Sequence, residues 1–334
     1  MTKVFIIAEI AQAHDGSLGI LHSYIDAAAA CGVDAVKFQT HIADAESSSA
    51  EPFRVNFSYV DKTRQDYWRR MEFTPEQWAG IKKHCDEVGV EFMSSPFSMA
   101  AVDILDQLDM RRWKIASGEV TNLCMLERIA KIKRQIIISS GMSSYAELDT
   151  AINMVKGYHD DYAIMQCTTS YPTPAEKVGL NVLQEMKKHY DCPVGLSDHS
   201  GRIEAMLAAV ALGAEFLEAH IVFDKRMFGP DAKSSLEVDN FKQLVDGVRF
   251  LEKTLANPVD KNDVADYAEN KKIFGKALSV RHNMNAGQII CFEDVETKKP
   301  SNEGIPAAKY KNIIGQKLAR DMSANEFLKE EDIA

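Results

Sequence analysis

The chain has 334 residues and a formal net charge of −10, with 46% hydrophobic and 26% charged residues. This length predicts about two domains, the acidic balance argues against a nucleic-acid-binding surface, and six cysteines without a CxxC spacing fit reduced thiols. No apolar run approaches the ~20 residues of a membrane span and no signal-peptide cleavage pattern is evident, so we expect a cytoplasmic protein without membrane contacts.

Short apolar, β-branched runs recur along the first 225 residues and predict eight strands, with helices between them. The strands are 4–10, 35–40, 91–97, 112–117, 135–140, 162–168, 193–198 and 216–222. The helices are 18–31, 74–87, 98–108, 122–132, 144–157, 180–190, 201–212 and 237–255. Eight such units predict a (β/α)8 (TIM) barrel over residues 1–255, and a doubly wound open sheet is the alternative.

Three segments depart from this repeat. Residues 41–73 are too long for a simple connection, and their aromatic and arginine content favours a functional loop over disorder. Residues 256–275 are polar and predict a linker. From Lys276 to the end, nine basic and nine acidic residues cancel, and turn signals between short strands predict a small β-rich domain over 276–334.

Polar residues end nearly every predicted strand. In a barrel the carboxyl ends of all strands share one face, where the chemistry of this fold takes place. We therefore expect an active site built from these side chains. They are Glu9, Lys37, Gln39, Ser95, Lys114, Ser117, Glu119, Ser139, Ser140, Gln166, Thr169, Tyr171, Ser197, His199, Glu218 and His220.

Lys37 and Lys114 lie inside otherwise apolar strands, where an unpaired ammonium group is costly. One interpretation is a structural ion pair with Glu9 or Glu218. The other is a binding site for a phosphate or carboxylate, which the neighbouring serine and threonine hydroxyls support.

His199 and His220 lie on consecutive predicted strands. If both point into the barrel mouth, they predict a divalent metal site, with Glu9, Glu119 or Asp231 as further ligands. Each histidine taken alone is more often a structural residue.

Nine motifs together resemble the sialic acid synthase family, from about residue 4 to 332. They are AEIAQAHDGS (8–17), AVKFQTH (35–41), MSSPFS (93–98), WKIASGE (113–119), IISSGMSS (137–144), QCTTSYPTP (166–174), GLSDHS (195–200), EAHIVFDKRMFGPDAKSSL (218–236) and KKPSNEGI (298–305). The resemblance implies a barrel followed by an antifreeze-like (SAF, β-clip) domain. It also implies condensation of phosphoenolpyruvate with N-acetylmannosamine or a related 2,4-diacylamino hexose, giving a nine-carbon 2-keto sugar acid of the sialic, legionaminic or pseudaminic type and phosphate.

The resemblance also implies roles for single residues. His199 and His220 would bind Mn²⁺, Mg²⁺ or Co²⁺, Lys37 would lie at the reacting centre, and Glu9 or Glu119 would transfer a proton. Besides Gln39, the resemblance implies two sets of substrate-binding residues. The residues that would bind the phosphate of phosphoenolpyruvate are Lys114, Ser95, Ser117, Ser139, Ser140, Thr169 and Ser197. The residues that would surround the acceptor sugar are Glu9, Glu119, Tyr171, Asp231, Phe274 and Lys299.

The family works as a domain-swapped homodimer in which the SAF domain of one chain supplies an arginine to the other chain's sugar site. Here Lys299 stands in that position, and lysine lacks the planar two-point contact of a guanidinium, so the acceptor sugar stays open. Three alternatives remain: a metal-dependent aldolase, a synthase of a related 3-deoxy-2-keto sugar acid, and a non-catalytic sugar-phosphate-binding protein.

Overall fold

The computed structural model describes residues 3–55 and 57–334. The chain divides into two compact units, Met1–Asn257 and Pro258–Ala334. In the described residues, no helix is long and apolar enough to cross a membrane.

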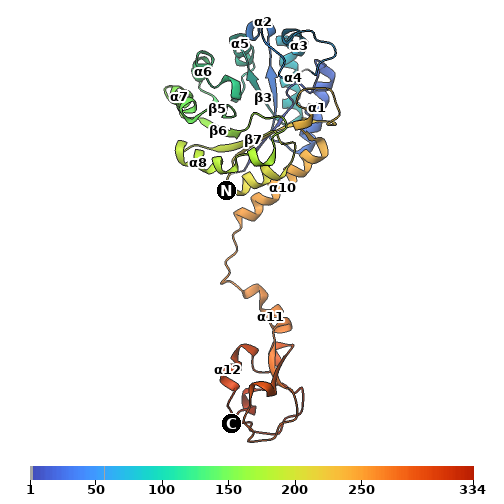
Figure 1. Ribbon diagram of the computed structural model, residues 1–334, viewed down its shortest axis with the longest axis vertical. Coiled ribbons are helices and arrows are strands. Elements are labelled where there is room, and N and C mark those ends of the chain that lie inside the picture. The colour runs from blue at the N-terminus through green and yellow to red at the C-terminus, as the bar shows by residue number, and fades with distance from the viewer. Residues whose placement is uncertain (1–2, 56) are drawn as a thin grey trace. The chain divides into compact units, whose positions relative to one another are not determined.

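The first unit is a closed parallel barrel, because β1 pairs with β2 on one side and with β8 on the other (Figure 1). This closure confirms the predicted barrel and excludes the open doubly wound sheet. A short β9 (Leu236–Glu237) pairs with β8 beyond the ring. The eight barrel strands are β1 (Phe5–Glu9), β2 (Ala35–Thr40), β3 (Glu91–Pro96), β4 (Arg112–Ile115), β5 (Gln135–Ser139), β6 (Tyr162–Cys167), β7 (Val194–Asp198) and β8 (Phe216–Val222).

Helices surround the barrel and bury their apolar faces against its outer surface. Local signals fix their ends: Ser17 accepts from Ile20 N at the start of the first helix, and Gly32 ends that helix with φ +84°, a value that favours glycine. The helices of this unit are α1 (Leu18–Cys31), α2 (Ala43–Glu46), α3 (Arg64–Met71), α4 (Pro75–Val88), α5 (Met99–Gln107), α6 (Leu123–Ala130), α7 (Tyr145–Lys156), α8 (Leu180–Tyr190), α9 (Glu204–Ala211) and α10 (Val238–Ala256).

The barrel interior changes from apolar to polar along the strands. One end is filled by a buried cluster to which alternate strand positions contribute, including Ile7, Ala35, Ile137 and Phe216. Successive side chains of a strand point to opposite faces, so the residues two positions further along also face inward. At those positions the sequence is polar, and this alternation carries the predicted site residues into the carboxyl end of the barrel.

The segment 41–73 is ordered by its own small core. Ala43, Tyr67, Trp68 and Met71 are buried together, with Phe53 packed against them. The sequence predicts a functional loop here, and the structure shows that this loop contains the two helices α2 and α3.

The second unit is small and has its own apolar core. Its regular structure consists of α11 (Ala268–Phe274), α12 (Tyr310–Ile313) and an antiparallel pair, β10 (Ala277–Val280) with β11 (Val295–Lys298). Isolated β-bridges join the remaining segments, and these pairings confirm the β-rich character predicted for this region. The core residues are Leu278, Val280, Met284, Ile290, Ile305, Ile313, Leu318, Met322 and Leu328.

Candidate active site

Two lysines and two glutamates form a buried cluster at the carboxyl end of the barrel. Lys37 Nζ lies 2.6 Å from Glu9 Oε2 and 3.7 Å from Glu218 Oε1. Lys114 Nζ lies 2.8 Å from the same Glu218 oxygen. The ion pairs that were one interpretation of these lysines are therefore present. Each ammonium carries three N–H donors, so this pairing leaves donors for an anionic ligand.

The surroundings shift the pKa values of the two carboxyl groups of the cluster in opposite directions. Burial alone would raise the pKa of Glu218, but Lys114 and Lys37 outweigh it and lower the pKa to about 2. Burial also raises the pKa of Glu9, where the opposing effect of Lys37 is insufficient. Glu218 is therefore ionised at neutral pH, whereas Glu9 can accept a proton. Two nearby carboxyl groups with different pKa values are a common basis for acid–base catalysis.

Hydroxyl groups gather beside this cluster. Ser197 donates to Glu218 Oε1 at 3.1 Å, and Lys37 donates to Ser95 Oγ at 3.4 Å. Ser139 Oγ is buried and has no hydrogen-bond partner among the described residues. A buried polar atom without a partner is rare in a folded protein, and a bound ligand is one explanation for it.

Gly141 marks the point where three strand ends converge. An added Cβ there would meet Thr169 Oγ1 at 2.5 Å and Ser117 Oγ at 2.6 Å, and the Gly141 N–H donates to Ser117 Oγ at 3.0 Å. The hydroxyls that follow β4 and β6 therefore lie against the loop that follows β5. Hydroxyls beside an ammonium group are the donors that phosphate prefers.

His199 and His220 lie together as predicted, with ring centroids 5.3 Å apart. Burial lowers the pKa of His220, which keeps this imidazole neutral and able to bind a metal. His199 Nδ1 lies 3.0 Å from the carbonyl oxygen of Thr168. That bond makes Nδ1 the donor and leaves the lone pair of Nε2 available to a ligand.

The chemistry of this histidine pair fits a divalent metal, although the protein supplies few ligands. No group of three His, Cys, Asp or Glu side chains placed to hold a metal occurs in the described residues, so the expected third ligand from Glu9, Glu119 or Asp231 is not seen. A two-histidine site leaves its other positions to water or substrate, as open catalytic sites do.

Tyr171 and Asp231 form the rim above the histidines. The Tyr171 ring lies 4.2 Å from the His199 ring, and burial raises the pKa of its hydroxyl. Asp231 Oδ1 accepts from Arg54 Nη2 at 2.8 Å, and the Arg54 guanidinium lies 4.2 Å from the Tyr171 ring centroid. An arginine of the 41–73 segment thus joins two predicted sugar-binding residues.

Two predicted residues lie apart from the central cluster. Glu119 accepts from Asn122 Nδ2 at 2.9 Å, and burial raises its pKa, with Glu46 as a further cause. Ser140 Oγ donates to Gln166 Oε1 at 3.4 Å. By position, Glu9 is therefore closer to the buried lysines than Glu119.

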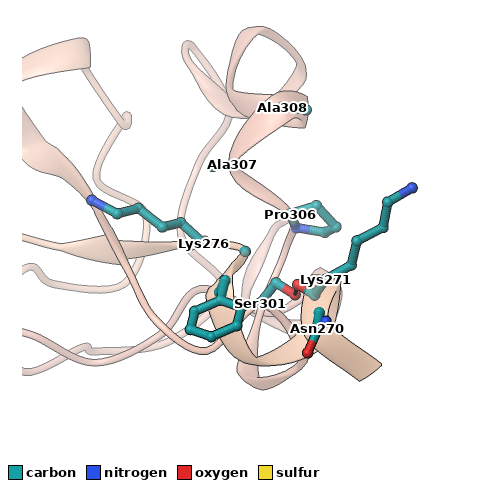
Figure 2. Close-up of a pocket in the computed structure, with 9 residues that line it drawn as sticks. Asn270, Lys271, Lys276, Ser301, Pro306, Ala307 and Ala308 are labelled. Atoms are coloured by element: carbon teal, nitrogen blue, oxygen red, sulfur yellow. Dashed lines mark hydrogen bonds between the residues drawn. The ribbon is translucent and has the colours of Figure 1, made fainter. Parts of the chain in front are cut away.

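Phe274 and Lys299 belong to the second unit. Lys299 Nζ lies 5.4 Å from the Phe274 ring centroid. Phe274 also lines an open pocket of about 650 Å³, in which Lys271 and Lys276 extend to opposite sides (Figure 2). These two predicted residues are therefore neighbours within their unit.

Two residues that sequence reasoning left out of the site are part of it. Gln12 and His41 were missed because they follow strands without a periodic pattern. Glu218, expected at a strand end only as a possible partner of a lysine, connects both lysines. Gln39 donates to Glu9 at 2.9 Å and contacts Gln12, whose Nε2 lies 2.9 Å from His41 Nε2.

Comparisons with known proteins cover both units. A family model described as NeuB family matches residues 24–260, and a SAF domain model matches residues 276–334. N,N'-diacetyllegionaminic acid synthase from Campylobacter jejuni is 32% identical, over 99% of this chain and 100% of the relative. N-acetylneuraminate-9-phosphate synthase from Homo sapiens is 33% identical, over 98% of this chain and 92% of the relative.

The fold is also similar to a solved structure. N-acetylneuraminic acid (sialic acid) synthetase from Leptospira borgpetersenii serovar Hardjo-bovis, in complex with citrate, superposes with a TM-score of 0.70 at 29% identity. The match covers 80% of this chain and 90% of that one.

Proposed function

The chain belongs to the NeuB family of sialic acid synthase-like enzymes, and we propose that it condenses phosphoenolpyruvate with an N-acylamino sugar. The product would be a nine-carbon 2-keto sugar acid, released with inorganic phosphate. One observation carries the proposal: two buried ammonium groups lie at the carboxyl end of the barrel with the unpartnered, buried hydroxyl of Ser139.

Lys114, Ser139, Ser117 and Thr169 would hold the phosphate group. Lys114 is paired with Glu218 alone among the described residues, so two of its N–H donors are open to phosphate oxygens. The hydroxyls around Gly141 add donors from neighbouring strand ends. Such preorganised donors stabilise the charge on the phosphate while it becomes a leaving group.

The reaction needs one new C–C bond and one broken C–O bond. The methylene carbon of phosphoenolpyruvate attacks the aldehyde carbon of the sugar, whose oxygen takes a proton. Water adds at the neighbouring carbon and loses its proton, and the C–O bond to phosphate then breaks, leaving the 2-keto acid. Glu9, with its raised pKa and its contact to Lys37, is the proposed proton acceptor.

We propose that His199 and His220 hold a divalent metal such as Mn²⁺, Mg²⁺ or Co²⁺. Two imidazoles close together, with His220 kept neutral by burial, suit such an ion. When bound, it would act as a Lewis acid toward the aldehyde oxygen. The protein's own contribution is to orient both rings, through the Thr168 carbonyl at His199 and through the strand at His220.

We also propose a domain-swapped homodimer in which the second unit serves the partner's site. Several apolar side chains at the start of this unit are exposed, as expected of a surface that a partner covers: Val259 is 77%, Tyr267 55%, Ile273 56% and Phe274 63% exposed. Contiguous exposed apolar surface usually marks an interaction site. Mixing two inactive full-length variants, Glu9→Gln and Phe274→Ala, should restore activity if each site uses both chains, whereas no recovery after subunit exchange contradicts the shared site.

The function is tested by a phosphate-release screen. The full-length chain is incubated with phosphoenolpyruvate or pyruvate and with N-acetylmannosamine or 2,4-diacetamido hexoses. Phosphate and a 2-keto acid formed only with phosphoenolpyruvate support the proposal. Activity with pyruvate alone supports the aldolase alternative and contradicts the proposal, and a preference for sugars without an acylamino group supports the 3-deoxy-2-keto acid alternative.

A further inference from the structure

The 41–73 segment places one arginine at the mouth of the barrel. Arg54 pairs with Asp231 at 2.8 Å and lies over the Tyr171 ring, which in turn contacts the ring of His199. A single aromatic ring thus separates the Arg54 guanidinium from the histidine pair. Arg54 is 41% exposed, and its one hydrogen-bond partner among the described residues is Asp231, so most of its N–H donors face outward.

The charge of this arginine is already balanced. All four arginines of the segment pair with carboxylates: Arg54 with Asp231, Arg64 with Glu51, Arg69 with Asp44, and Arg70 with Asp61. A phosphate dianion bound at Arg54 would lie beside the Asp231 carboxylate and be repelled by it. A neutral oxygen, such as an amide carbonyl, can accept from the guanidinium without this cost.

Asp231 also lines a void of about 10 Å³ with His220, Val222 and Pro230, which has room for no more than one water molecule. The acceptor must therefore meet Arg54 at the open mouth, where this side chain is 41% exposed, rather than in the void.

We propose that Arg54 is a specificity residue that donates to the acylamino carbonyl of the acceptor rather than to a phosphate. The inference rests on the proposed function and deepens it by assigning the residue that recognises the acylamino group. It also gives a role to the 41–73 segment, which supplies a sugar-binding group from within the same chain. Asp231 orients the guanidinium, and Tyr171 supports its flat face.

The test compares the full-length parent with Arg54→Gln, Arg54→Lys and a control, Arg69→Gln. Arg69 belongs to the same segment, is 50% exposed and pairs with Asp44, so the control removes a similar guanidinium from outside the site. Phosphate release is measured with phosphoenolpyruvate and four acceptors: N-acetylmannosamine, a 2,4-diacetamido hexose, N-acetylmannosamine 6-phosphate and mannose, which lacks the acylamino group.

The parent should prefer an acylamino sugar over mannose. Arg54→Gln should raise the KM of the acylamino sugar about 10- to 100-fold, because a charged donor is lost, while the KM of phosphoenolpyruvate changes less than about twofold. With mannose, parent and Arg54→Gln should agree within about twofold, a result that general damage to the fold would not give. Arg54→Lys should fall between them, and Arg69→Gln should match the parent.

Three outcomes overturn the inference. A parent that uses mannose as well as it uses an acylamino sugar contradicts recognition of the acylamino group. An unchanged acceptor KM in folded Arg54→Gln contradicts the role of the arginine, while the parent's activity leaves the proposed function standing. If the parent releases no phosphate with any acceptor, the result contradicts both the proposed function and this inference.

Discussion

Two ion pairs of equal length show how differently the barrel interior and its rim use charge. Lys114 Nζ to Glu218 Oε1 and Arg54 Nη2 to Asp231 Oδ1 are both 2.8 Å. The interior side chains are 2% and 5% exposed, whereas those of the rim are 41% and 15% exposed. Water and salt screen the rim pair, and neither reaches the interior pair. Burial, not distance, therefore decides what each pair does.

The difference assigns the two regions different tasks. In the interior, Lys37, Lys114 and Ser197 all contact Glu218, so the cluster suits the steps common to every turnover: binding the phosphate and moving a proton. At the rim, one exposed arginine can exchange its partner for a ligand at little cost. The interior would set the reaction, and the rim would select the acceptor sugar.

The largest effect should come from the metal proposed between these regions. Removing it with EDTA should lower turnover by more than about 1000-fold, because a Lewis acid contributes several kcal/mol at the aldehyde. The free energy of unfolding should change little. Bound metal, measured by mass spectrometry, should be lost in His199→Ala and His220→Ala and retained in the control His22→Gln, a partly exposed histidine on α1. Unchanged metal content in both histidine variants would contradict the assignment.

The comparison itself is tested by removing one carboxylate from each pair. Glu218→Ala should lower the free energy of unfolding by about 3–5 kcal/mol, because Lys37 and Lys114 are left buried without their shared partner. Asp231→Ala should cost less than about 1 kcal/mol, because Arg54 can turn to solvent. Urea denaturation measures both. Equal losses would mean that distance rather than burial governs the pairs.

Gly141 offers a test of the interior that leaves its charges in place. Gly141→Ala should lower kcat/KM about 100-fold, because the new methyl group displaces the hydroxyls of Thr169 and Ser117 by a large fraction of an ångström. Gly118→Ala is the matched control, since an added Cβ there meets nothing closer than 3.7 Å. The loss should fall mainly on the KM of phosphoenolpyruvate, and an unaffected KM would place the phosphate elsewhere.

Sequence alone predicted the interior better than the rim, for a physical reason. A strand alternates with a period of two, so the polar residues Lys37 and His220 in apolar strands already indicated which side chains meet. Closure of the ring then brings distant strands together, as with Lys114 of β4 and Glu218 of β8. Glu218 was considered only as a possible partner because pairing across the barrel is not encoded in local spacing.

The rim depends on contacts that no period describes. Arg54 lies in a 41–73 segment without alternation, and its partner Asp231 is 177 residues away along the chain. The aromatic and arginine content indicated a functional loop, but not which arginine reaches the mouth. His41 was likewise set aside as a loop histidine, and only the structure shows it stacked on Trp68, with ring centroids 3.8 Å apart.

The smallest effect we predict concerns His14, which lies in the turn after β1. Burial, together with His41 and Arg70, lowers its pKa from the ordinary 6.5 to about 3, and its Nδ1 accepts from the Gly16 N–H at 3.0 Å. Protonation would break that bond. Because the folded pKa is the lower one, the stabilisation is complete above pH 6.5 and declines as the pH falls toward 3.

Between about pH 6.5 and 5.5 the loss should be about 1 kcal/mol, measured by urea denaturation at each pH. His14→Asn keeps an acceptor near the position of Nδ1 and does not titrate, so its loss over this range should be about 1 kcal/mol smaller than the parent's, with His220, whose pKa burial also lowers, contributing equally to both. A parent and a variant with the same slope would show that the pH dependence arises elsewhere. Neither slope should involve Glu218, whose pKa of about 2 lies below the range. The turn after β1 would then respond to mild acid while the interior cluster keeps its charge.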